Sequence, residues 1–119
     1  MRFYSIIIPV YNRPDEVQEL LESLRQQTYR NFEVIIVEDG SSNKCDEVVK
    51  VFEEELEIHY FFKENSGQGF SRNFGFDKAR GDFFVVFDSD CLIPDHYFDT
   101  VEKYLDEHQL HAYGGPDKD

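Results

Sequence analysis

The order of hydrophobic and polar residues along this 119-residue chain predicts strands that alternate with helices. Four short apolar runs have the length and the Val, Ile and Phe content that are typical of buried strands. These runs are Tyr4–Val10, Phe32–Val37, Ile58–Phe62, which contains a histidine, and Asp82–Phe87, and Leu110–Tyr113 is a candidate start of a fifth.

The segments between these runs repeat apolar residues every three or four positions, as amphipathic helices do. Val17, Leu20, Leu21 and Leu24 form the clearest stripe, and Pro14 suits the first turn of that helix. The helices predicted in this way are Asp15–Gln27, Asp46–Glu55, Phe70–Ala79 and Pro94–Glu107. Because Phe70 and Phe74 lie one turn apart in the third of them, we expect both to face the core.

Strands that alternate with helices indicate βαβ units. We therefore predict the α/β class, as a three-layer αβα sandwich with a mostly parallel sheet. The length fits one domain that occupies residues 1–119. Phe83 to Phe87 is apolar without interruption, so we expect the strand that contains it to be buried on both faces.

The composition is strongly acidic, with 25 Asp and Glu against 12 Lys and Arg and a net charge of −13. This balance argues against general binding to nucleic acids or anionic membranes, which would repel the chain. A small phosphorylated ligand is still compatible, because one arginine and a metal ion can dominate a single cleft. No apolar run has the length of a membrane span or a signal peptide. Cys45 and Cys91 could form one disulfide, but we expect two reduced thiols in a cytoplasmic protein.

Polar and aromatic residues gather just after the predicted strands. Ligands of open parallel sheets bind at the carboxyl ends of the strands, so these positions form the candidate site. Tyr11 offers a flat face for a base or a sugar, although packing over the sheet is an equally ordinary role. Asp39 can accept hydrogen bonds from a base or a ribose, or it can form an Asx-turn. The residues at the strand exits are Tyr11, Asn12, Glu38, Asp39, Asp88 and Asp90.

Asp88 and Asp90 form the strongest pair of candidate ligands. Residues two apart on an extended chain point to the same side, and two carboxylates aimed at one point repel each other unless a cation lies between them. Mg2+ and Mn2+ take oxygen ligands of this kind together with substrate phosphates. The alternative is a turn in which these side chains accept backbone N–H groups, since a lone Asp-x-Asp is a weak motif.

Arg72 is the best candidate to face a phosphate, because its planar fork pairs with two oxygens at once. Its alternative role is a surface ion pair in an acidic protein. Together these residues predict a site for a nucleotide diphosphate that is held by a metal ion.

Five segments carry a family resemblance through their order and spacing. The chain resembles a family 2 glycosyltransferase over essentially its whole length. The segments are SIIIPVYNR at Ser5–Arg13, VEDGSS at Val37–Ser42, N-x-G with SRN-x-G within Asn65–Gly75, A-x-G at Ala79–Gly81 and VVFDSD at Val85–Asp90. The resemblance implies a GT-A fold and inverting transfer of a sugar from a nucleotide-diphosphate donor, usually a UDP-sugar, to an acceptor hydroxyl in glycan or polysaccharide synthesis.

The resemblance also implies roles by position. Pro9, Tyr11 and Asp39 would hold the base and ribose, and Arg72 would lie near the diphosphate. Asp90 would be the main ligand of a divalent cation, Mg2+ or Mn2+, and Asp88 would contact ribose or metal. The nucleotide-binding set expected from all of these considerations is Pro9, Tyr11, Asn12, Glu38, Asp39, Arg72 and Asp88.

The chain departs from the family pattern in three ways. Glu38 stands where the family more often has Asp, and Cys91 stands where a third acid is frequent. The third departure is that the chain ends at Asp119, whereas members of the family continue beyond this point. We expect the catalytic base and the residues that bind a saccharide or lipid-linked acceptor in that continuation. By itself, this chain is therefore expected to bind the donor but not to transfer its sugar. Any association with the inner face of the membrane would come from those further segments. Gly114–Pro116 resembles the strand that follows the metal site in the family.

Three other classes share parts of this pattern. A phosphoacceptor signalling domain would need an acidic pair after the first strand, where Tyr11 and Asn12 stand instead. A nucleotidyltransferase would usually carry a Gly-rich basic loop at that place. A non-catalytic nucleotide-binding or partner-recruiting module of the same fold is the alternative that the sequence leaves open.

Overall fold

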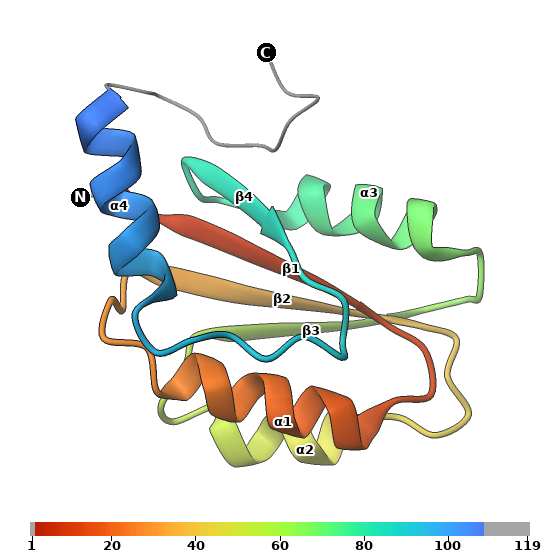
Figure 1. The fold of residues 1–119 in the computed structure, drawn as a ribbon. Helices are drawn as coiled ribbons and strands as arrows, with labels where there is room; N and C mark the ends of the chain where they lie inside the picture. The colour runs from red at the N-terminus through yellow and green to blue at the C-terminus, as the bar shows by residue number, and fades with distance from the viewer. Residues whose placement is uncertain (1, 109–119) are drawn as a thin grey trace.

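The structure is a computed structural model that describes residues 2–108, and its sheet is parallel. The strands are β1 (Tyr4–Val10), β2 (Phe32–Asp39), β3 (Ile58–Lys63) and β4 (Phe83–Val86), in the order β3-β2-β1-β4. The helices are α1 (Pro14–Arg25), α2 (Asp46–Phe52), α3 (Gln68–Lys78) and α4 (Tyr97–His108). This alternation confirms the predicted α/β class and the mostly parallel sheet (Figure 1). The predicted features at Leu110–Tyr113 and Gly114–Pro116 lie outside the described residues.

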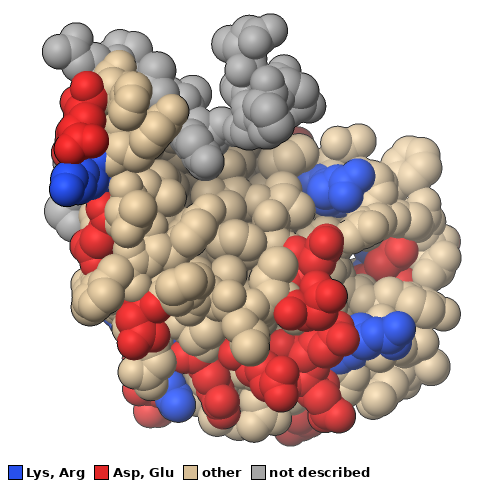
Figure 2. All heavy atoms as spheres, in the orientation of Figure 1, with Lys and Arg blue, Asp and Glu red and all other residues tan. Residues whose placement is uncertain are grey.

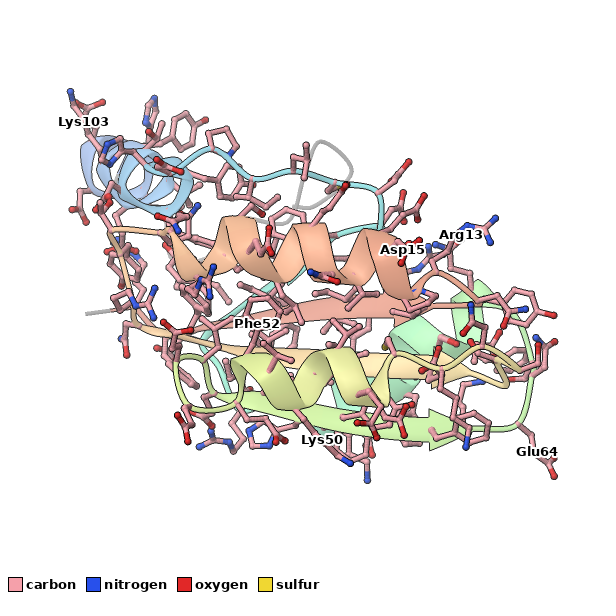
Figure 3. The ribbon with its side chains drawn as sticks, turned by 90° about the horizontal axis from the view of Figure 1, so that it is seen from below. Arg13, Asp15, Lys50, Phe52, Glu64 and Lys103 are labelled. Atoms are coloured by element: carbon pink, nitrogen blue, oxygen red, sulfur yellow. The ribbon has the colours of Figure 1, made fainter. Side chains whose placement is uncertain are left out.

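The alternation of side chains along β1 assigns the helices to the two faces of the sheet. Ile6 and Ile8 pack in the larger core cluster, which also holds the apolar stripe of α1 and Phe98 of α4. Ile7 points to the opposite face and packs in a smaller cluster that includes Phe74 of α3. Figure 1 shows α3 on one side of the sheet and α1 and α2 on the other. Seen from below in Figure 3, α1 and α2 lie side by side over the sheet, with Phe52 between them.

The strand registers bring three strand exits to one edge of the sheet, which we call the carboxyl edge. Val10 is paired with Glu38, and Asp39 is paired with Lys63, so β1, β2 and β3 end close together. Arg13 and Glu64 are labelled at this end in Figure 3, and Lys103 of α4 lies at the opposite end. The polar residues that follow the strands are therefore neighbours, as the sequence predicts.

β4 differs from its prediction. It lies at an edge of the described sheet and pairs only with β1 there, and its side chains are more deeply buried on one face than on the other, which is partly exposed. Phe84 is 43% exposed and stacks on Phe76 of α3, with ring centroids 5.7 Å apart. A continuous apolar run is typical of a central strand, but the sequence does not encode where the strand lies in the sheet.

The prediction that Phe70 faces the core is wrong, because its side chain is 68% exposed. Phe74, one turn later, does pack against the sheet and lies 5.5 Å from Phe61, ring centroid to ring centroid. The residues of α3 that are buried are Ser71 and Gly75. α3 therefore approaches the sheet through small residues, which a search for large apolar residues does not detect.

Two glycines of the motif segments sit where the backbone leaves no room for a side chain. A Cβ on Gly75 would lie 2.5 Å from Cγ2 of Ile7 in β1. A Cβ on Gly81 would lie 2.6 Å from the hydroxyl of Ser5 and 2.7 Å from the carbonyl of Phe3. The glycines of SRN-x-G and A-x-G therefore allow α3 and the turn before β4 to approach β1 closely.

Candidate nucleotide-binding site

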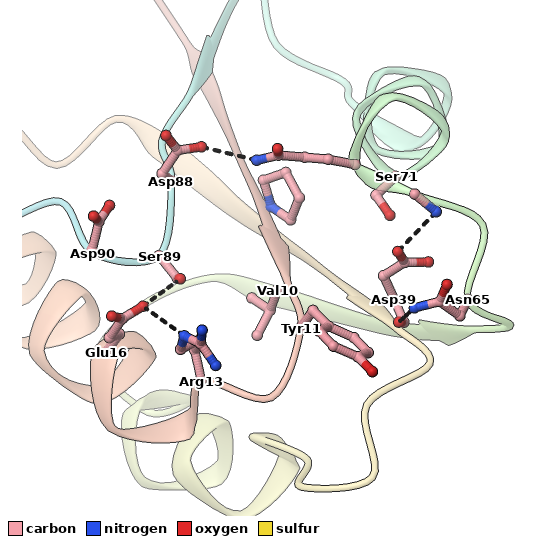
Figure 4. A pocket seen from close by; sticks show the side chains of 13 residues that line it. Val10, Tyr11, Arg13, Glu16, Asp39, Asn65, Ser71, Asp88, Ser89 and Asp90 are labelled. Carbon is pink, nitrogen blue, oxygen red and sulfur yellow. Dashed lines mark hydrogen bonds and ion pairs between the residues drawn. The ribbon is translucent and has the colours of Figure 1, made fainter.

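An open cleft of about 580 Å³ lies at the carboxyl edge of the sheet (Figure 4). This volume is in the range of small-molecule sites, about 300–1,000 Å³. Segments that follow β1, β2, β3 and β4 form its walls. The lining residues are Pro9, Val10, Tyr11, Arg13, Glu16, Asp39, Asn65, Gly67, Gln68, Ser71, Asp88, Ser89 and Asp90.

The exit of β1 supplies the floor of the cleft. Pro9 and Tyr11 both line it, as predicted, and the ring of Tyr11 is half exposed. Asn12 does not line the cleft. Its backbone is in the left-handed region, with φ of 53°, and its side-chain oxygen accepts a hydrogen bond from the backbone N–H of Asn43 at 2.8 Å. Asn12 therefore joins the loops after β1 and β2 and holds the position of Tyr11.

Asp39 lines the opposite wall, where the protein itself already satisfies its carboxylate. Oδ1 lies 2.6 Å from Nζ of Lys63 and accepts the N–H of Ser66 at 2.8 Å, and Oδ2 accepts the N–H of Gly67 at 3.0 Å. Burial alone raises the pKa of Asp39, but Lys63 and the two backbone N–H groups outweigh it, so the pKa is lowered. Asp39 is therefore ionised at neutral pH and fixes the loop that begins α3.

Glu38 points away from the cleft and is fully buried. Its Oε1 accepts hydrogen bonds from the N–H of Cys45 at 2.9 Å and from the hydroxyl of Tyr60 at 2.7 Å. Burial, and then this carboxylate, raise the pKa of Tyr60, so its hydroxyl stays a donor. Glu38 thus organises the start of α2. Its side chain does not reach the cleft, so the geometry does not support the predicted contact with a nucleotide.

Asp88 and Asp90 face the cleft from a turn that follows β4. The strand ends at Val86, and the N–H of Cys91 donates to the carbonyl of Asp88 at 3.1 Å. The extended chain assumed for this pair is therefore wrong, yet both exposed side chains line the cleft. The hydrogen bond that closes this turn uses the backbone carbonyl of Asp88, so the turn does not occupy the side-chain carboxylate of Asp88 or of Asp90. Asp88 Oδ1 instead accepts a hydrogen bond from the Gln68 amide at 3.0 Å.

Several lining residues were not predicted. Glu16 in the first turn of α1 accepts a hydrogen bond from the Ser89 hydroxyl at 2.8 Å and lies 3.9 Å from Nε of Arg13, as Figure 4 shows. Arg13 is the last residue of the SIIIPVYNR segment, and its place in that segment could have identified it as a candidate site residue. Glu16 and Gln68 do not directly follow a strand, so a search at the strand exits does not find them. Among the residues that line the cleft, Arg13 is the basic one.

Arg72, like Asn12 and Glu38, is a predicted residue that the structure does not place in the cleft wall. It lies one helical turn beyond Gln68 on α3 and is half-buried. Its position on the same helix keeps it close to the cleft without making it a lining residue. The structure thus brings together Pro9, Tyr11, Asp39, Asp88 and Asp90, and it leaves Asn12, Glu38 and Arg72 outside the wall.

The charge of the cleft fits an additional cation. Four acids line it against Arg13, and Lys63 behind the wall pairs with one of them, Asp39, so an excess of negative charge is left. Acidic side chains also spread over the face seen in Figure 2. A diphosphate would be repelled by this set unless a metal ion neutralised part of the charge. Asp88 and Asp90 offer oxygen donors only, which suits Mg2+ or Mn2+. No helix among residues 2–108 is long and apolar enough to cross a membrane.

Comparisons with known proteins agree with this geometry. The family model "Glycosyl transferase family 2" matches residues 5–118. An uncharacterized glycosyltransferase of Rickettsia bellii is 38% identical over 106 residues, which cover 89% of this chain and 15% of that protein. Glycosyltransferase GlyA of Streptococcus pneumoniae is 36% identical over 106 residues, with 88% and 15% covered. The chain therefore spans about one sixth of the length of these relatives.

Two solved structures share the fold. S. aureus TarS 1–349 in complex with UDP-GlcNAc matches with a TM-score of 0.85 and 29% identity, over 97% of this chain and 37% of TarS. The mannosyltransferase PcManGT from Pyrobaculum calidifontis, in complex with GDP-Man and Mn2+, matches with a TM-score of 0.78 and 26% identity, over 87% of this chain and 32% of that one. The family model covers nearly the whole chain, and the neighbours have the GT-A fold: the chain belongs to glycosyl transferase family 2.

Proposed function

We propose that this chain is the donor-binding part of an inverting glycosyltransferase that uses a nucleotide-diphosphate sugar, best fitted by a UDP-sugar. The observation that carries the proposal is the convergence of Tyr11, Asp39, Asp88 and Asp90 on one cleft from three separate strand exits. A structural neighbour binds UDP-GlcNAc, and another binds GDP-Man with Mn2+, which supports a donor of this class. Acceptor choice, in glycan or polysaccharide synthesis, would lie in segments like those that the longer relatives have outside this match.

The two walls of the cleft have different tasks in this proposal. Tyr11 presents its ring to the base, and Asp39 holds the loop of Asn65 and Gly67 against the ribose side. Both oxygens of Asp39 are already hydrogen-bonded, so any contact with the nucleotide would add a further bond to one of them. Asp88 and Asp90 lie across the cleft, where the diphosphate would reach them (Figure 4).

Asp88 and Asp90 would hold Mg2+ or Mn2+, and such a cation supplies positive charge against the departing diphosphate. Arg13 lines the cleft, and Arg72 lies one helical turn beyond the lining residue Gln68 on α3. Arg13 would place its guanidinium against phosphate oxygens, and this interaction strengthens as the leaving group gains charge. In this proposal, the base that deprotonates the acceptor hydroxyl is not one of the described residues. We propose that the longer protein supplies it.

Titration calorimetry of UDP with and without Mn2+ tests the proposal. We expect Mn2+ to tighten UDP binding about 10-fold or more. Asp90→Ala should abolish that gain, whereas Asp95→Ala, an exposed acid of the same segment outside the cleft, should keep it. UDP binding that ignores Mn2+ and is unchanged in Asp90→Ala would rule the proposal out.

The alternative function is a non-catalytic module that binds a nucleotide or recruits a partner. The full-length protein decides between the two, because only an enzyme transfers or hydrolyses the sugar of a UDP-sugar. Asp90→Ala should then lower turnover about 100- to 1,000-fold, the usual effect of removing a charge-stabilising group. A cytoplasmic location is part of the proposal, and both cysteines are free thiols, which suits a reducing compartment.

A further inference from the structure

Three potential metal ligands meet at the amino edge of the sheet, where the strands begin, far from the nucleotide cleft. Glu33 is the second residue of β2, His59 is the second residue of β3, and Glu57 immediately precedes β3. One carboxylate oxygen of each glutamate and one ring nitrogen of His59 lie within 4.8 Å of one another. The register that pairs Val34 with Ile58 places all three side chains on the same face of the sheet.

Glu33 gives the cluster a feature that surface acids lack, because it is fully buried. Its Oε2 accepts hydrogen bonds from the Ser5 hydroxyl at 2.6 Å and from the N–H of Arg80 at 2.8 Å. Its Oε1 accepts no hydrogen bond within the described residues, and it faces Nε2 of His59 at 3.5 Å and the Arg80 guanidinium at 3.1 Å. A buried carboxylate oxygen in this situation needs compensating positive charge.

The spacing of the donor atoms suits a tetrahedral ion. Zn2+ binds His nitrogen and carboxylate oxygen at about 2.0–2.2 Å, so its ligand atoms lie about 3.3 Å from one another. Nε2 of His59 lies 3.5 Å from Oε1 of Glu33 and 2.9 Å from Oε2 of Glu57. The nitrogen ligand favours Zn2+ over Mg2+ and Ca2+, which prefer oxygen ligands alone. We propose that Glu33, Glu57 and His59 form a zinc site, with a water molecule as the fourth ligand.

Arg80 is the cation that now balances these carboxylates. Its guanidinium lies 3.1 Å from Oε1 of Glu33 and also contacts Glu57. Its side chain is 59% exposed, so it can turn into solvent when an ion arrives. One Arg charge compensates one of the two carboxylates, whereas a divalent ion compensates both. Zn2+ and the Arg80 guanidinium therefore compete for the same two carboxylates. Removal of Arg80 should tighten Zn2+ binding at this site, whereas it should not affect weak binding of Zn2+ to surface acids elsewhere.

Calorimetric titration of Zn2+ into the chain tests the site, in a background that carries Asp88→Ala and Asp90→Ala so that the proposed metal ligands of the nucleotide cleft are absent. We expect Glu57→Gln and His59→Asn each to weaken Zn2+ binding about 10-fold or more. His108→Asn, which removes an exposed histidine at the far end of α4, should leave the affinity unchanged. Arg80→Ala should strengthen binding, because it removes the competing cation.

Thermal unfolding provides a second readout. Zn2+ at 100 times its dissociation constant should raise the midpoint for the parent chain and raise it less for His59→Asn. Three outcomes would overturn the proposal: no measurable Zn2+ binding, an affinity that survives both Glu57→Gln and His59→Asn, or an Arg80→Ala variant that binds Zn2+ no more tightly than the parent. Glu33 is left intact because its burial and its bonds to Ser5 and Arg80 support the fold.

Discussion

Lys63 and Asp39 form an ion pair across the ends of β3 and β2, with Nζ 2.6 Å from Oδ1. Both side chains are nearly buried, and the same carboxylate also binds the backbone of Ser66 and Gly67. The pair therefore sets the shape of one wall of the nucleotide cleft before any ligand arrives.

Lys63→Met should remove this pair and lower the free energy of unfolding by about 1.5–3 kcal/mol at neutral pH, the usual value of a hydrogen bond to a charged group. UDP binding should weaken as well, because the loop that Asp39 holds lines the cleft. Urea unfolding and UDP calorimetry measure the two effects. Lys50→Met, which breaks the exposed pair with Glu47, is the matched control and should change neither.

The same pair should make stability depend on pH in the acid range. The pKa of Asp39 is lowered in the folded state, so its contribution is present above the ordinary aspartate pKa of about 3.9 and disappears as the pH falls through the lowered value. Urea unfolding of the parent chain at pH 7 and at pH 3 should show this loss, and Asp39→Asn should show a smaller one. An acid dependence that Asp39→Asn leaves unchanged would contradict this assignment.

Arg13→Ala should weaken binding of UDP in the presence of Mn2+ by about 10-fold, because Arg13 is the basic residue in the cleft wall and charge-assisted hydrogen bonds to phosphate are strong. Calorimetry measures this loss, and uridine, which lacks phosphates, serves as the control ligand and should bind both proteins equally. A larger loss in Arg72→Ala than in Arg13→Ala would place the diphosphate further along α3.

Gly75→Ala should destabilise the fold by about 1–3 kcal/mol, because its Cβ would overlap Ile7 of β1. Gly69→Ala lies in the same helix and meets nothing within 4 Å, so the higher helix propensity of Ala should make it neutral or stabilising by up to about 1 kcal/mol. Thermal unfolding of the two variants gives opposite signs. Equal effects would show that α3 does not pack on β1 through Gly75.

Phe98→Ala should cost about 3–5 kcal/mol, since Phe98 is fully buried between Tyr4 and Phe32, with ring centroids 5.1 and 5.4 Å away. Phe70→Ala removes the same atoms from an exposed position and should stay within about 0.5 kcal/mol. Chemical denaturation compares them directly, and a large loss in Phe70→Ala would mean that its ring is packed.

The sequence predicted the elements well because their signals are local. β1 was predicted with its observed bounds, and β2 and β3 begin where expected, because their apolar runs are bounded by polar turns. α4 begins at Tyr97 instead of Pro94, since the N–H of Tyr97 closes a turn onto the carbonyl of Pro94 first. The place of β4 at the sheet edge and the exposure of Phe70 depend on tertiary packing, which no local pattern records.

The candidate site was predicted in part for a similar reason. The rule that ligands bind at the carboxyl ends of parallel strands singled out Tyr11, Asp39, Asp88 and Asp90, and these four residues line one cleft. The rule does not state which way a side chain turns at a strand exit. Glu38 and Asp39 are neighbours, yet one faces α2 and the other faces the cleft, because successive residues of a strand point to opposite sides.

The alternation along β1 has a consequence that extends past the core. Ile6 and Ile8 point to one face and Ile7 to the other, and Tyr11 follows directly after the last residue of the strand, Val10. Inserting or deleting one residue within β1 would exchange the two faces and also carry the aromatic ring to a different height and direction. The length of this strand in whole residues thus fixes where the ring of Tyr11 lies in the cleft and, under the proposed function, the depth at which a base would rest.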